Sequence, residues 1–299
     1  MLRVWLLAIA FCLTLSGCAT APPVEQVRAF ANASDAFNAA SQPLLDEVAV
    51  AERERAWKLI KTPPDDAPHV LDVPLPGGAT RRLQLDLPVE DVLAISTIGD
   101  PPATAEFRRG VGTIKHYAAV LVLLAENQNI DAARAELGIL ATNIAGAAAL
   151  VPGAQAASAL VSPALAELQP FIDNAVRAQN AAELRLLVLD ANRSIKKLNA
   201  ELRKGAEPLF HTIASGQREV IIGLNDPAAA VDRIDAYRVS FANWLMLLDL
   251  VDQATDQLVA AVSNPTNAVS LGSLAELSTR ITTSAEGTRR ALAVFRVGK

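Results

Sequence analysis

Residues 181–213 read AAELRLLVLDANRSIKKLNAELRKGAEPLFHTI, and their pattern of apolar and polar residues predicts an α-helix. The apolar residues recur at spacings of three, four and seven, which places them on one face of a helix. Charged and polar residues fill most positions between them, so we expect one side to be buried and the other to face water. The apolar face consists of Leu184, Leu187, Ala191, Ile195, Leu198, Leu202, Leu209 and Ile213.

This helical pattern extends in both directions, from Pro163 to about Leu224. Pro170 and Pro208 lie inside it and should bend the helix, because proline lacks a backbone donor and its ring crowds the preceding turn. The piece between these prolines, residues 171–207, would extend on the order of 55 Å at 1.5 Å per residue. We therefore expect an elongated molecule.

Helical periodicity covers most of the remaining chain as well. The connections between expected helices are short, which favours antiparallel neighbours. Only 4% of the chain is aromatic, and the apolar residues are mostly alanine, leucine and valine, which suits closely packed helices. The sequence therefore predicts an all-α fold, an elongated up-and-down multi-helix bundle. Its other helices are expected over residues 25–61 (interrupted near Pro43), 104–127 and 131–151, and from about residues 227 and 265 onward.

Three sequence junctions indicate where helices start. In Ser162-Pro163, Asp226-Pro227 and Asn264-Pro265, a residue with a capping side-chain oxygen precedes a proline. The oxygen accepts hydrogen bonds from the first free amides of a helix, and proline fits the first helical position because its missing donor is not needed there. We therefore expect helix starts near these three prolines.

Residues 62–103 interrupt the helical pattern. Eight prolines fall within them, which excludes a continuous helix apart from one short piece over Val89–Ile98. Leucines at alternate positions (83, 85 and 87) follow Gly77-Gly78. Alternation is typical of a strand, and paired glycines are typical of a turn. We interpret the segment as a proline-rich excursion from the bundle that can hold a small β-hairpin.

The first eighteen residues resemble the export signal of a bacterial lipoprotein. An uncharged apolar run from Val4 to Leu15 follows one basic residue, which outlines a signal peptide and is too short to span a membrane. It ends in Leu15-Ser16-Gly17-Cys18, which resembles the lipobox: an aliphatic residue, two small residues and the cysteine that is acylated. The resemblance implies cleavage before Cys18 and attachment of acyl chains there, and two or three chains anchor a protein stably. An ordinary signal peptide or an uncleaved N-terminal anchor is the alternative.

This resemblance divides the chain into a signal peptide (1–17), a lipidated tether (18–24) and a single helical-bundle domain (25–299) with its irregular insertion. In Gram-negative lipoproteins an aspartate after the cysteine favours retention in the inner membrane, and this chain has Ala19 there. The resemblance therefore implies the periplasmic face of the cell outer membrane. With Cys12 removed and Cys18 acylated, the mature chain would contain no free thiol and no disulfide.

The residues that carry catalysis do not form a recognisable constellation. His69, His116 and His211 are scattered, and no His-Glu-x-x-His pattern occurs. No Gly-x-Ser-x-Gly turn is present, and no cysteine would remain for nucleophilic chemistry. The sequence therefore favours a protein that is not an enzyme and that carries no catalytic residues, no metal and no cofactor.

An acidic stripe is the nearest approach to a metal site. Asp249, Asp252 and Asp256 would share one helix face, and carboxylates in such a row can bind a divalent cation. A solvated face beside the apolar stripe is the simpler interpretation. The formal net charge of the chain is −5, which argues against a nucleic-acid partner because such proteins usually carry a basic face.

Two glycines and two tryptophans have structural interpretations. Gly110 and Gly112 lack the remaining glycine of a dinucleotide-binding loop, so we expect them to allow close helix packing or to bend a helix. Trp57 and Trp244 are expected to anchor the core or an interface.

The longest uncharged segment spans residues 137–166, with Pro152-Gly153 near its middle. It reads as two apolar helices joined by a turn. Each arm has about 14 residues, roughly 20 Å of helix, which is short of the ~30 Å hydrocarbon core of a membrane. We therefore expect this hairpin to be buried against the 104–127 helix and the long 163–224 helix.

Two functions of different classes fit these features. The first is a non-enzymatic, lipid-anchored scaffold or binding lipoprotein of the cell envelope. Its partners would be membrane lipid, through acylated Cys18, and an envelope protein. The alternative is a membrane-active helical bundle that uses the apolar hairpin 137–166.

Overall fold

In a computed structural model of the chain, the amphipathic stretch at residues 181–213 lies within one long helix. This helix, α8, runs Ala181–Gly223 and has 43 residues. Its apolar side chains face the core as their spacing predicts, and Ile195, Leu198 and Leu202 are fully buried. The structure describes residues 24–61, 70–84, 92–126, 130–148, 158–178, 181–223, 227–264 and 268–296.

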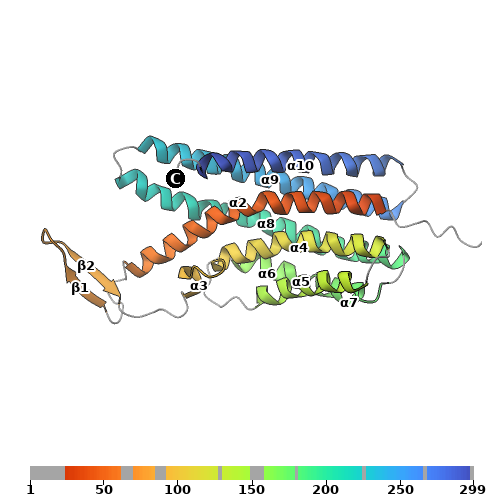
Figure 1. Cartoon of the computed structure of the whole chain (residues 1–299), viewed down its shortest axis with the longest axis horizontal. Coiled ribbons are helices and arrows are strands. Elements are labelled where there is room, and N and C mark those ends of the chain that lie inside the picture. The colour runs from red at the N-terminus through yellow and green to blue at the C-terminus, as the bar shows by residue number, and fades with distance from the viewer. Residues whose placement is uncertain are drawn as a thin grey trace, which may run out of the picture.

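The chain folds as an all-α multi-helix bundle, which confirms the predicted fold class. Long helices that follow one another in the chain run in opposite directions, and the molecule is elongated along them (Figure 1). The elements in the described residues are α2 (Val24–Lys61), β1 (Val70–Pro74), β2 (Thr80–Gln84), α3 (Val92–Ile95), α4 (Pro102–Ala125), α5 (Ile130–Ala148), α6 (Ser158–Ala166), α7 (Gln169–Ala175), α8, α9 (Pro227–Ser263) and α10 (Ala268–Arg296).

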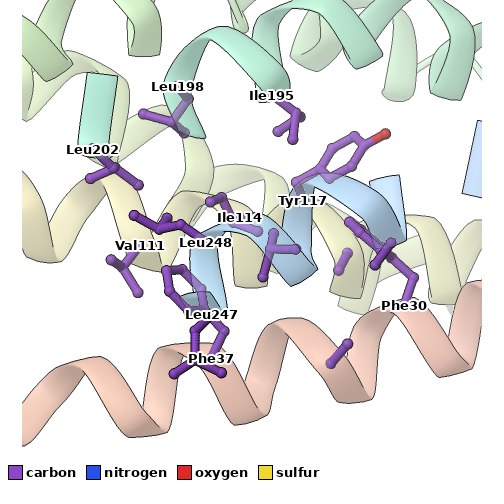
Figure 2. Close-up of a cluster of buried hydrophobic side chains, with 14 of the residues drawn as sticks. Phe30, Phe37, Val111, Ile114, Tyr117, Ile195, Leu198, Leu202, Leu247 and Leu248 are labelled. Carbon is purple, nitrogen blue, oxygen red and sulfur yellow. The ribbon is translucent and has the colours of Figure 1, made fainter. Parts of the chain in front are cut away.

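One hydrophobic cluster runs through the bundle and draws side chains from all of its long helices. Trp244 of α9 is its largest fully buried side chain, and its ring stacks on Phe37 of α2 with centroids 6.3 Å apart. Aliphatic side chains fill the space around these rings, because an interior packs to near-crystalline density. Figure 2 shows how Phe30, Phe37, Val111, Ile114, Tyr117, Ile195, Leu198, Leu202, Leu247 and Leu248 converge from α2, α4, α8 and α9.

Two glycines let α4 and α8 approach each other. A Cβ atom on Gly205 of α8 would lie 1.9 Å from Cζ of Phe107 on α4, so no larger residue fits there without movement. A Cβ on Gly110 of α4 would lie 2.9 Å from Cδ2 of Leu202 on α8. The expectation of close packing at Gly110 is therefore confirmed.

The expectation of one helix from Pro163 to about Leu224 is wrong. The chain forms α6, α7 and α8 there, with turns at residues 167–168 and 176–177. Pro170 is the second residue of α7, where its missing amide hydrogen is not needed, and the chain reverses before α8 (Figure 1). These turns allow α7 to pack on both α5 and α8, which a straight helix would not allow.

The proline junctions have different outcomes. Helix α9 starts at Pro227 as expected. The start expected at Pro163 is wrong, because α6 begins at Ser158 and contains that proline. Pro265 lies outside the described residues, and α10 is described from Ala268. Pro43 lies inside α2 and Pro208 inside α8, so neither proline ends its helix.

The proline-rich segment holds the small β-hairpin that the sequence predicts. Strands β1 and β2 pair antiparallel, with Leu71 opposite Leu83. Gly77 and Gly78 form the turn, with φ angles of +97° and +82° that favour glycine. The short helix α3 lies within the expected Val89–Ile98, whereas positions 85 and 87 fall outside the described residues.

The uncharged segment 137–166 packs on the bundle as predicted, in its described parts. Helix α5 packs on α4 and α6, and α6 packs on α8. Leu140 of α5 is fully buried, whereas Ile139 beside it is 42% exposed, so α5 has an inner and an outer face. The turn expected at Pro152-Gly153 lies outside the described residues. None of the described helices combines the length and apolar character needed to cross a membrane.

Candidate functional site

Helix α2 separates the start of the described chain from the β-hairpin. The lipidation site expected at Cys18 lies outside the described residues, and α2 begins shortly after it, at Val24. With 38 residues, α2 extends on the order of 55 Å. The β-hairpin and α3 lie at the end of the molecule where α2 ends (Figure 1). This end is therefore far from the point where α2 begins.

Arg53 near the end of α2 holds the segment that joins α3 to α4. Its guanidinium donates from Nε to the carbonyl oxygen of Ser96 over 2.9 Å, and from Nη2 to that of Gly99 over 2.6 Å. Gly99 has a φ of +79°, in the left-handed region that favours glycine. The charged guanidinium group of Arg53 thus holds two carbonyl groups of one tight turn in place.

The neighbouring Glu52 caps α4. Helix α4 has free amides at its N-terminus, and Pro101 before it has no side-chain oxygen to accept them. Oε1 of Glu52 accepts the amide of Ala103 over 3.0 Å, and Oε2 accepts the amide and the hydroxyl of Thr104, each over 3.0 Å. The carboxylate charge also suits the positive end of the helix dipole. Consecutive residues of α2 therefore position the α3–α4 loop and the start of α4.

Arg108 of α4 fixes the same loop from the other side. Its Nε and Nη2 donate to the two carboxylate oxygens of Asp100, over 2.7 and 3.2 Å. Nη2 also lies 3.0 Å from Oδ1 of Asp46 on α2. The loop is consequently held by ionic and backbone hydrogen bonds from two helices.

Exposed apolar side chains lie on several elements at this end of the molecule. Ile98 is 88% exposed, although the loop that carries it is held in place. We call the group the distal tip; it comprises Val50 and Trp57 of α2, Leu71 of β1, Leu75 of the hairpin turn and Ile98.

The distal tip was not identified from the sequence. Its residues are separated by up to 48 positions, and the contacts of Arg53 and Glu52 that order it span 43 to 52 positions. A local pattern contains no sign of such contacts. The one local signal is Ile98 itself, an apolar residue between a threonine and a glycine inside a proline-rich segment.

The acidic stripe forms ion pairs with α8. Lys196 lies 2.8 Å from a carboxylate oxygen of Asp256 and 3.7 Å from one of Asp252, and Arg203 pairs with Asp249. Their hydrogen bonds favour the charged form and raise the pKa of Lys196. Within the described residues, no group of three or more acidic, histidine or cysteine side chains is placed to hold a metal ion.

The other sequence candidates lie apart. His116 on α4 lies 2.6 Å (Nδ1) from a carboxylate oxygen of Glu136 on α5, His211 lies on α8, and His69 is outside the described residues. Trp244 is a core anchor as expected, whereas Trp57 is 44% exposed and belongs to the distal tip.

A row of polar groups on α4 holds the uncharged segment 137–166. Glu106 is fully buried, and its Oε1 accepts the amide of Ser162 on α6 over 2.6 Å and the hydroxyl of Ser162 over 2.5 Å. One turn further along, Arg109 donates from Nη1 to the carbonyl of Gly146 on α5 over 3.1 Å. Two charged residues of α4 therefore bind one arm each.

Comparison of the chain with protein-family models, with curated proteins and with solved structures finds no match. What these contacts can do is therefore argued from their geometry and chemistry.

Proposed function

We propose that this protein is a lipid-anchored helical scaffold of the cell envelope, attached through acylated Cys18 to the periplasmic face of the outer membrane. It binds an envelope protein at the distal tip and catalyses no reaction. The observation that carries the proposal is the separation between the start of α2, just after the expected anchor, and the distal tip at its other end, on the order of 55 Å away.

The chemistry of the tip fits a protein partner. Val50, Trp57, Leu71, Leu75 and Ile98 offer separate apolar anchors on a helix, a hairpin and a loop. A few residues supply most of the binding energy of an interface, and tryptophan is enriched among them, so Trp57 is the main anchor we expect. The bonds of Arg53 and Arg108 hold the loop in one conformation, which reduces the conformational entropy lost on binding.

Site-specific photo-crosslinking in intact cells tests the tip. A photoreactive residue at Thr97, exposed beside Ile98, should give a discrete protein adduct. The matched control is the same residue at Thr279, which is exposed on α10. Adducts of equal yield from both positions, or none from Thr97, would contradict binding at the tip.

The anchor is tested separately. Cys18→Ser should move the protein from the membrane fraction to the soluble fraction or leave an uncleaved precursor, because the thiol that accepts the lipid is gone. Fractionation with mass spectrometry of the N-terminus measures both outcomes. Normal processing with an unchanged membrane fraction would exclude lipid anchoring.

A further inference from the structure

Glu106 is buried between the core of the bundle and α6. Its side chain is fully shielded from water, and Oε2 has no hydrogen-bond partner among the described residues. Oε1 accepts the amide and the hydroxyl of Ser162 on α6. A buried carboxylate oxygen without a donor is costly when the group is charged and far less costly when it carries a proton.

The surroundings of Glu106 supply little opposing charge. Arg109, on its own helix, is the charged group that acts on it, and its Nη1 is already bonded to a carbonyl of α5. From α6 it meets Ser162 and the backbone of Val161, and no charge. In the next turn, Gly110 lies against apolar side chains of α6 and α8, Val161 and Leu202.

On the side of α4 that faces α2, the charged groups pair with one another. Arg108 binds Asp46 and Asp100 there. These paired groups therefore add no compensating charge for Glu106 beyond that of Arg109.

We propose that the packing of the α5–α6 layer on α4 is a proton-linked equilibrium, in which Glu106 takes up a proton when the layer is docked and releases it when the layer opens. Burial raises the pKa of Glu106 above its usual value, and the bonds from Ser162 and the charge of Arg109 oppose this shift only in part. The docked layer is therefore tightest in mild acid and loosens as the pH rises.

The layer loosens with rising pH because docking is linked to the binding of a proton by Glu106. The open state exposes Glu106 to water, where its pKa is about 4.3, whereas the docked state holds the proton to higher pH. Between the two pKa values, each pH unit raises the opening equilibrium constant up to tenfold. Above the pKa of the docked state the constant levels off. This proposal is independent of the anchor and of the distal tip.

Amide hydrogen exchange of the full-length chain in mild detergent, from about pH 5 to about pH 8, measures this opening. After correction for the intrinsic exchange rate, protection of peptides from α6 should fall with pH by up to tenfold per unit within the window. Peptides from α10, which packs on α2 and α9, are the internal control and should not change.

Two variants test whether Glu106 causes the pH dependence of protection in α6. Glu106→Gln keeps the shape of the side chain and has no proton to release, so protection of α6 should become independent of pH. Ser162→Ala removes the hydroxyl that stabilises the docked carboxylate, so the upper end of the pH window should move to higher pH while the lower end stays in place. Glu276→Gln removes an exposed carboxylate on α10, outside the α5–α6 layer, and is the control that should leave the profile of α6 unchanged.

Parallel loss of protection in α6 and α10, or a pH profile of α6 that survives Glu106→Gln, would overturn the proposal. If Glu106→Gln does not fold, the wild-type profile and its displacement by Ser162→Ala decide the matter, and an unmoved profile counts against it.

Discussion

Trp244 on α9 donates its indole Nε1–H to the hydroxyl oxygen of Ser41 on α2 over 2.8 Å, and both side chains are buried. The hydroxyl of Ser41 in turn donates to the carbonyl of Phe37 over 2.8 Å. This pair satisfies the one polar atom of the largest side chain in the core. A helix–helix contact that would otherwise be purely apolar thus acquires a fixed register.

Ser41→Ala should lower the free energy of unfolding by about 1–3 kcal/mol, because it leaves the Trp244 donor buried without an acceptor. Ser34→Ala is a matched control, since Ser34 is also buried on α2 and bonds only to the carbonyl of Phe30. Ser34→Ala should lower the free energy of unfolding by less than about 1 kcal/mol. Urea denaturation compares the two variants, and equal losses would show that the Trp244 bond contributes nothing.

Gly205→Ala should destabilise the fold by about 1–3 kcal/mol, because the new methyl group would collide with the ring of Phe107. Gly216 lies on the same helix with open space around its Cβ position. Gly216→Ala should therefore stabilise the protein by roughly 0.5–1 kcal/mol through helix propensity. Thermal melts of both variants test the close approach of α4 and α8, and a stabilising Gly205→Ala would contradict it.

Because the acidic stripe is occupied by ion pairs, we expect the stability of the protein to be unaffected by metal removal. Asp256→Asn should change the stability by less than about 1 kcal/mol, because its pair with Lys196 is largely exposed and screened by salt. A chelator should leave the melting temperature unchanged, in low and in high salt. A melting temperature that falls on chelation and recovers with a divalent cation would restore the metal-site interpretation.

The sequence predicted those features that depend on local chemistry. The spacing of apolar residues in 181–213 predicts the buried face of α8, and Asp226-Pro227 predicts the start of α9. Proline alone does not end a helix, and Pro208 remains inside α8 because Leu209 and Ile213 after it are buried in the same core. Tertiary packing there outweighs the cost of one lost hydrogen bond.

The features missed from the sequence depend on contacts between distant residues. Ser162 carries the capping signal that proline junctions share, yet its amide and hydroxyl bind Glu106, 56 positions earlier. Nothing local distinguishes Glu106 from the solvated carboxylates of other helices. The distal tip was missed for the same reason, because Arg53 of α2 orders a loop far from it in sequence.

The uncharged segment 137–166 gives the last prediction, which separates a packed layer from a membrane-active one. Residues 19–299 contain no cysteine, so a single thiol can be placed at will. Ala164 on α6 is fully buried, whereas Ala145 on α5 is exposed.

A polar maleimide should label the Ala164→Cys variant on the order of a hundredfold more slowly than Ala145→Cys, because the buried thiol reacts only when the layer opens. Added lipid vesicles should change neither rate. Rapid labelling of Ala164→Cys in water that vanishes with vesicles would mean that the segment leaves the bundle for lipid, and the scaffold proposal would then give way to a membrane-active protein.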